Sequence, residues 1–181
     1  MKKFEEKTLH TEEIFNGKII RVQLDKVLLP NGETSYREIV KHPGAVAIIP
    51  ITNDYKIIFV EQYRKPLERS LIEIPAGKLE KGEQPEITAI RELEEETGYT
   101  TKELTYVTSF YTSPGFANEL IHIYMTDKLM PLPKVKKGDE DEFVDLIEMT
   151  LNEAKQLEKD KRIYDAKTIY ALKYIELLRM K

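Results

Sequence analysis

The feature that most constrains the fold of this chain is a glycine-led helical segment over residues 77–99. Pro85 suits the first turn of a helix, where its missing N–H would have no partner. Gly98 suits the end of a helix, because glycine adopts the left-handed conformation without steric cost. The pattern therefore predicts a glycine loop followed by a helix over residues 85–97.

The predicted helix divides its side chains between two sides, at about 100° per residue. The apolar residues expected to face a core are Ile87, Ala89, Ile90 and Leu93. The acids expected on the other side are Glu92, Glu95 and Glu96. Their i,i+3 and i,i+4 spacing lets the carboxylates converge on one point, and Arg91 can pair with Glu95 four residues later.

Three carboxylates on one helix surface repel each other unless they face open solvent or a cation. A solvated acidic face is the common alternative for an isolated acidic helix. Here the acids stand at fixed offsets from Gly77, Glu83, Arg91 and Gly98, which favours a cation. Hard oxygen donors suit Mg²⁺ or Mn²⁺, and Mg²⁺ usually bridges to substrate phosphates. The segment therefore predicts a metal-dependent enzyme for phosphate-ester or pyrophosphate chemistry.

These residues resemble the Nudix box, G-x5-E-x7-R-E-U-x-E-E-x-G-U, in which U is a bulky apolar residue. The matching residues are Gly77, Glu83, Arg91, Glu92, Leu93, Glu95, Glu96 and Gly98. Tyr99 departs from the pattern, because an aliphatic residue is usual there. The resemblance implies an α/β (α+β) fold, a Nudix-type α/β/α sandwich with a mixed sheet. It also implies an N-terminal β region over residues 1–42 that makes a homodimer, ahead of a Nudix hydrolase domain over 43–181.

The order of elements from about residue 40 to 180 resembles the ADP-ribose pyrophosphatase branch of that family. Residues 74–77 are similar to the strand-end turn before the box in that branch. Pro114, sixteen residues past Gly98, resembles its substrate marker, and residues 139–143 resemble the acidic loop that holds its catalytic base.

The resemblance implies hydrolysis of the pyrophosphate bond of ADP-ribose to AMP and ribose 5-phosphate, with Mg²⁺ or Mn²⁺. It implies Glu92, Glu96 and the backbone carbonyl of Ala76 as metal ligands. Glu95 is expected to be a further ligand or to orient the cluster with Arg91. Glu142 is the candidate general base, and Glu140 is the alternative.

The resemblance also points to substrate contacts. Arg64, at a strand end, resembles an arginine that holds a substrate phosphate, with a surface ion pair as the alternative. Arg37 could contribute from the N-terminal hairpin across a dimer, or form a surface ion pair instead. Pro114 and Gly115 complete the expected set. Glu73 is either near the metals or a plain strand carboxylate.

Other positions carry weaker signals. Glu83 is expected to fix the loop as an acceptor rather than to bind metal. His10, His42 and His122 show no metal-ligand spacing. The chain has no tryptophan, so a tyrosine or phenylalanine would have to stack on an adenine ring.

Composition narrows the classes of protein. The chain of 181 residues suits one full core, and its net charge of −4 argues against nonspecific binding to nucleic acid or to an anionic membrane. It has no cysteine, which excludes disulfides and thiol catalysis and favours the cytoplasm. Neither a signal peptide nor a membrane span is expected.

Residue patterns predict the remaining elements. Strands are expected over 6–14, 17–29, 34–41, 44–51, 56–63, 71–75, 104–112, 119–128 and 143–149, and helices over 150–157 and 165–180. Residues 131–141 are expected to form a charged loop. Three alternative functions stay open: a Nudix enzyme for a nucleotide sugar, NADH or a dinucleoside polyphosphate; a non-catalytic ADP-ribose sensor; and a cation-binding structural protein.

Overall fold

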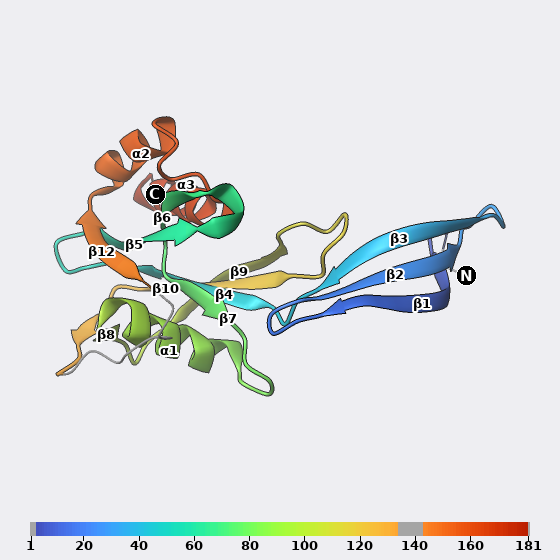
Figure 1. The fold of residues 1–181 in the computed structure, drawn as a ribbon. Coiled ribbons are helices and arrows are strands. Elements are labelled where there is room, and N and C mark those ends of the chain that lie inside the picture. Colours follow the sequence, from blue (N-terminus) through green and yellow to red (C-terminus); the bar gives the residue numbers. More distant parts are fainter. Residues whose placement is uncertain (1–2, 134–142, 181) are drawn as a thin grey trace. The chain divides into compact units, whose positions relative to one another are not determined.

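A computed structural model describes residues 3–133 and 143–180 of the chain. The chain separates into two compact units. The N-terminal unit contains residues 1–44 and 110–121, and the core unit contains residues 45–109 and 122–181. Figure 1 shows the elements of both units, which together form the predicted α/β fold.

The N-terminal unit is built on a three-stranded antiparallel sheet in the order β1-β2-β3. Its strands are β1 (Lys7–Asn16), β2 (Arg21–Leu28) and β3 (Thr34–Lys41). The second strand begins later than the sequence predicted, because the N–H of Gly17 donates to the carbonyl of Ile20 and closes a turn. A parallel bridge between Val40 and Ala117 joins the segment 110–121 to this unit.

The other strands lie wholly or mainly in the core unit, and all the described α-helices belong to it. Four strands pair in the order β7-β4-β10-β9: β7 (Ala76–Lys78), β4 (Ala45–Pro50), β10 (Leu120–Thr126) and β9 (Thr105–Tyr111). Three strands pair in the order β12-β5-β6: β12 (Val144–Met149), β5 (Ile57–Arg64) and β6 (Arg69–Glu73). The pair β11-β8 joins Met130–Pro131 to Tyr99–Thr100.

The helices lie on opposite sides of these strands, with α1 on one side and α2 and α3 on the other (Figure 1). They are α1 (Pro85–Thr97), α2 (Leu151–Lys159) and α3 (Ala166–Arg179), and a short 3₁₀ helix, η1 (Lys65–Leu67), follows β5. Among the described residues, no helix is both long enough and apolar enough to cross a membrane.

Helix α1 begins and ends where the sequence predicted. Pro85 is its first residue, and Gly98 caps its end with φ of 72°. Ala89 and Leu93 are fully buried and pack against Val46 and Ile48 of β4. This contact holds the helix to the strands that position the candidate site.

The predicted division of α1 into two sides was partly wrong. Ile87 is 57% exposed, whereas Glu92 is only 8% exposed. At about 100° per residue, Ile87 lies roughly 120° from Leu93, and Glu92 lies roughly 60° from Ala89. Glu92 therefore falls within the buried arc, where it meets the backbone of β7 rather than a layer of side chains.

The short strands were not predicted. Residues 76–78, expected in a glycine loop, pair with β4 as β7, and residues 130–131 pair with β8 as β11. Strands of two or three residues carry too few side chains to show an alternating pattern.

Candidate active site

Gly77 lies in β7 directly beside the carboxylate of Glu92. A Cβ atom at Gly77 would lie 1.9 Å from Cδ of Glu92, which no real contact allows. Only a residue without a side chain lets the strand approach the helix this closely. The glycine that opens the motif is therefore required by the acid fifteen positions later.

Arg91 holds acids from both the helix and the loop before it. Its Nη1 donates to Oε1 of Glu92 at 2.8 Å and to Oε2 of Glu95 at 2.9 Å. Its Nη2 lies 3.3 Å from Oε2 of Glu83. Burial opposes the guanidinium charge, but these carboxylates outweigh that cost and raise the pKa of Arg91. The predicted pair of Arg91 and Glu95 is confirmed, and the cation offsets repulsion among the acids.

Glu83 fastens the loop to α1 as an acceptor, as predicted. Its carboxylate accepts from Oγ1 of Thr88 at 2.7 Å and from Arg91. Burial acts to raise the pKa of Glu83, but the hydrogen bonds from Arg91 and Thr88 lower it overall.

Glu96 is held by the backbone of β7. The N–H of Ala76 donates to Oε2 of Glu96 at 2.9 Å, so Glu92 and Glu96 approach adjacent residues of one strand. No three His, Cys, Asp or Glu side chains within residues 3–133 and 143–180 are arranged to hold a metal ion. The predicted set needs only two carboxylates, with the carbonyl of Ala76, and the structure brings these residues together. Such oxygen donors fit a hard divalent cation.

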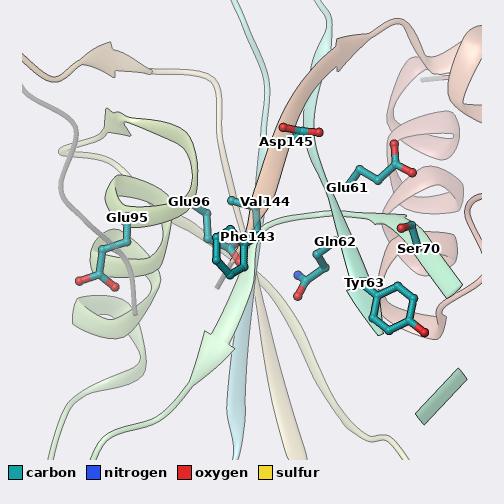
Figure 2. A pocket seen from close by; sticks show the side chains of 9 residues that line it. All are labelled: Glu61, Gln62, Tyr63, Ser70, Glu95, Glu96, Phe143, Val144 and Asp145. Atoms are coloured by element: carbon teal, nitrogen blue, oxygen red, sulfur yellow. The ribbon is translucent and has the colours of Figure 1, made fainter. Parts of the chain in front are cut away.

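A cavity of about 580 Å³ opens beside these acids. Figure 2 shows its lining side chains coming from α1, β5, β6 and the beginning of β12. They are Glu61, Gln62, Tyr63, Ser70, Glu95, Glu96, Phe143, Val144 and Asp145. Tyr63 and Phe143 are 57% and 84% exposed, so solvent reaches both aromatic side chains.

Sequence reasoning did not identify these two rings. The only signal was their position in the chain, because Tyr63 precedes Arg64 and Phe143 follows the acidic loop. That they line one cavity follows from the pairing of β12 with β5, in which Val144 lies opposite Gln62.

Glu73 is buried at the end of β6 between two cations. Nε and Nη2 of Arg64 donate to its two oxygens at 2.7 and 2.6 Å, and Nζ of Lys167 also donates to it. Burial favours the neutral acid, but the hydrogen bond from Arg64 and the charge of Lys167 lower the pKa of Glu73 to about 2. Arg64 thus forms the ion pair that the sequence left open, and Glu73 is a paired strand carboxylate.

The first turn of α3 supports the strand-end turn from the same side. Asp165 caps α3 by accepting from the N–H of Thr168 at 3.1 Å. Oγ1 of Thr168 accepts from the N–H of Ile74 at 2.9 Å. Since Ile74 lies two residues before Ala76, this helix fixes the backbone that reaches the acids. Neither Lys167 nor Thr168 was singled out from the sequence.

The remaining predicted residues belong to the N-terminal unit or lie outside the described residues. Arg37 belongs to the N-terminal unit, where its Nε and Nη2 donate to Glu6 at 2.8 and 2.6 Å. Pro114 and Gly115 belong to the same unit, in a loop where Ser113 accepts from the N–H of Phe116. The two candidate bases, Glu140 and Glu142, lie outside the described residues.

Comparisons with known proteins match both parts of the chain. Residues 41–172 match the NUDIX domain, and residues 6–40 match the nucleoside diphosphate sugar hydrolase N-terminal domain. A methanol dehydrogenase activator of Bacillus methanolicus is 61% identical over 97% of this chain and 95% of its own length. An ADP-ribose pyrophosphatase of Bacillus subtilis (strain 168) is 58% identical over 98% of this chain and 96% of its own. A crystal structure of an ADP compounds hydrolase shares the fold, with a TM-score of 0.84 at 23% identity over 96% of this chain and 94% of that chain.

Proposed function

This chain belongs to the Nudix family of hydrolases, and we propose that it hydrolyses the pyrophosphate bond of ADP-ribose to AMP and ribose 5-phosphate. The observation that carries the proposal is the gathering of Glu92 and Glu95 around Arg91, beside the glycine strand. The 58% identity to an ADP-ribose pyrophosphatase supports the choice of substrate.

Nudix hydrolases generally use divalent metals, and we propose Mg²⁺ here, with Mn²⁺ as the alternative. Glu92, Glu96 and the carbonyl of Ala76 would hold it. Such an ion, when bound, neutralises diphosphate oxygens and lowers the pKa of a water molecule. The chain contributes by holding the donors in place: Arg91 fixes Glu92 and Glu95, and the N–H of Ala76 fixes Glu96. Preorganised groups of this kind need no rearrangement during the reaction.

We keep Glu142 as the proposed general base, with Glu140 as the alternative. Glu142 directly precedes Phe143, which lines the cavity together with Glu95 and Glu96. A base at this position would be next in sequence to a residue that lines the cavity. It could take a proton from the attacking water.

The cavity also suggests how the substrate is held. Adenine would stack on Tyr63 or Phe143, whose rings are exposed there. Arg64 is 39% exposed through its side chain, so it could turn toward a phosphate while Lys167 keeps Glu73 neutralised. Arg37, Pro114 and Gly115 remain proposed substrate contacts.

We propose that residues 1–42 form the contact of a homodimer. All ten residues of β1 are exposed, including the apolar side chains of Leu9, Ile14 and Phe15. Analytical ultracentrifugation should give twice the mass of one chain, and Leu9→Ser with Ile14→Ser should shift it toward one chain. A parent that sediments as a single chain would contradict the dimer.

A second candidate function comes from the relative in Bacillus methanolicus, which is named as a methanol dehydrogenase activator. Its 61% identity over nearly the whole chain supports the proposal that this protein also activates a dehydrogenase. Purified methanol dehydrogenase should turn over faster when the chain is added. An unchanged rate would reject this candidate.

A cytoplasmic location, predicted from the absence of cysteine, stays a prediction.

The deciding experiment measures AMP release with Mg²⁺ from ADP-ribose, NADH, diadenosine polyphosphates and ADP-glucose, and GMP release from GDP-mannose. Preference for ADP-ribose supports the proposal, and preference for another substrate rejects it while keeping the Nudix chemistry. Glu92→Gln should lose most activity, whereas Glu80→Gln, an exposed acid in the same motif, should not. Binding of ADP-ribose without turnover would favour a sensor.

A further inference from the structure

The strand-end turn between β6 and β7 is held by two helices at once. The N–H of Ile74 donates to Oγ1 of Thr168 in α3 at 2.9 Å. The N–H of Ala76 donates to Oε2 of Glu96 in α1, also at 2.9 Å. Pro75, which stands between them, has no N–H. Both N–H groups of this turn therefore bond to helix side chains.

The hydroxyl group of Thr168 is arranged to accept a hydrogen bond. Its single proton is donated to Oδ2 of Asp165 at 2.9 Å, so its lone pairs remain for the N–H of Ile74. The N–H of Thr168 donates to the same carboxylate, which fixes the side chain at the first turn of α3. The negative charge of Asp165 polarises the hydroxyl group and strengthens the bond that it accepts.

This contact has no substitute in the folded chain. Thr168 and Ile74 are both 0% exposed, so solvent water does not reach the N–H of Ile74. A buried N–H that loses its partner is costly, and the backbone must move to find another acceptor. Such a movement would pass through Pro75 to Ala76, which carries a proposed metal-binding carbonyl and holds the carboxylate of Glu96.

We propose that Thr168 is a positioning residue of the metal site. Its hydroxyl group sets the backbone at Ile74, and so places the carbonyl of Ala76 and the carboxylate of Glu96. The inference rests on the proposed function, which supplies these two ligands. Thr168 acts through the backbone and not by touching the ion. Groups that orient metal ligands in this way change metal affinity by about 10- to 100-fold.

The test compares Thr168→Val, which removes the hydroxyl group and nearly keeps the shape, with Thr168→Ser, which keeps the hydroxyl group. Binding of Mn²⁺ alone is measured from the EPR signal of the free ion. Thr168→Val should weaken binding at least about tenfold, and Thr168→Ser should bind as the parent does. The matched control is Thr101→Val. Thr101 is also buried, and its Oγ1 accepts from the N–H of Glu103 at 3.1 Å in a loop without proposed ligands, so Mn²⁺ binding should not change.

Kinetics separate positioning from a general loss of stability. In Thr168→Val, the Mg²⁺ concentration for half-maximal hydrolysis should rise at least about tenfold. Its kcat at saturating Mg²⁺ should stay within about twofold of the parent value, because the bound ion restores the arrangement of its ligands. A variant that is only unstable would instead lose rate at every Mg²⁺ concentration, since part of the chain is unfolded.

A measurement on the parent needs no variant to fold. Coupling between two sites is reciprocal, so Mg²⁺ should also stabilise the bond from Ile74 to Thr168. Hydrogen exchange followed by NMR should show the amide of Ile74 slowed by Mg²⁺ more than the amide of Glu103. Equal slowing of the two amides would overturn the role of Thr168.

Three results with the variants would also overturn it: unchanged Mn²⁺ binding in Thr168→Val, no recovery in Thr168→Ser, or an equal loss in Thr101→Val. In each case the parent still binds Mn²⁺ and hydrolyses its substrate, so the proposed function stands. A failure of the proposed function shows in the parent instead. A parent that binds no Mn²⁺ would reject the proposed ligands and, with them, the role of Thr168.

Discussion

Strands β1 and β4 differ more in solvent exposure than any other two long strands described here. All ten residues of β1 are exposed, whereas all six residues of β4 are buried. β4 has a neighbouring strand on each side in its sheet and packs against α1, whereas β1 is an edge strand. Strands β1 to β3 together bury only Asp25 and Val27.

The difference shows how stability and function are distributed. The acids of the candidate active site stand on a helix that packs against the fully buried strand β4, so their positions follow from a hydrophobic core. The N-terminal sheet has almost no core of its own, and small sheets need a packed face to be stable. The stability of the N-terminal sheet therefore depends on hydrogen bonds, on charge pairs and on contacts with a bound molecule or second chain.

The largest expected effect compares a leucine in each region. Leu93→Ala should lower the free energy of unfolding by about 3 kcal/mol, because it opens a cavity against Val46 and Ile48. Leu9→Ala in β1 should change it by less than about 0.5 kcal/mol, since that side chain is already exposed. Denaturant unfolding measures both. An equal loss for Leu9→Ala would show that β1 is covered in solution.

The second prediction concerns pH. The folded pKa of Glu73 is about 2, below its ordinary value of 4.5, so its ionised form stabilises the fold above about pH 4.5. That contribution, at most about 3 kcal/mol, is lost as the pH falls through 4.5 toward 2. Urea unfolding from pH 7 down to pH 3 should show the stability difference between the parent and Glu73→Gln shrinking in that window. Glu6→Gln, at an exposed ion pair of the N-terminal unit, should show a smaller change over the same window, because solvent screens that pair; a constant difference for Glu73→Gln would contradict the pairing.

The third prediction compares two glycines. Gly77→Ala should lower the hydrolysis rate at least about a hundredfold, because its Cβ atom must displace the carboxylate of Glu92. Gly32→Ala, in the hairpin between β2 and β3, meets no atom within 4 Å but has a φ of 88°. It should cost about 1 kcal/mol of stability and leave the rate unchanged. Steady-state kinetics of the two variants separate these effects, and full activity of Gly77→Ala would reject the close approach.

The smallest expected effect concerns the hydrogen bonds to the buried carboxylate of Asp25 in the N-terminal sheet. Oγ1 of Thr11 donates to Asp25 at 2.7 Å, and Nε2 of Gln23 donates to the same oxygen at 2.9 Å. Thr11→Val should lower the local stability of β1 and β2 by about 1 kcal/mol. Amide hydrogen exchange of those strands measures it. Faster exchange confined to the core unit would contradict this role of Asp25.

Local signals in the sequence were the reliable ones. Pro85 and Gly98 act through their own backbone preferences, so both ends of α1 were predicted. The pairing of Arg91 with Glu95 depends only on helix spacing, and the structure confirms it.

Signals that depend on distant parts of the chain could not be predicted. Nζ of Lys167 donates a hydrogen bond to Glu73 from 94 positions away, and no pattern in the sequence marks that contact. The buried position of Glu92 depends on a strand of three residues passing beside it. The rings of Tyr63 and Phe143 meet one cavity only because β12 pairs with β5.

The bridge between Val40 and Ala117 has a consequence for how the chain can be divided. The N–H of Val40 donates to the carbonyl of Phe116, and the N–H of Asn118 donates back to the carbonyl of Val40. A truncation after residue 44 would remove one half of this ladder and leave the other half in the remaining fragment. The N-terminal sheet is therefore not a detachable module, and recombining it with a foreign domain would require grafting the segment 110–121 as well.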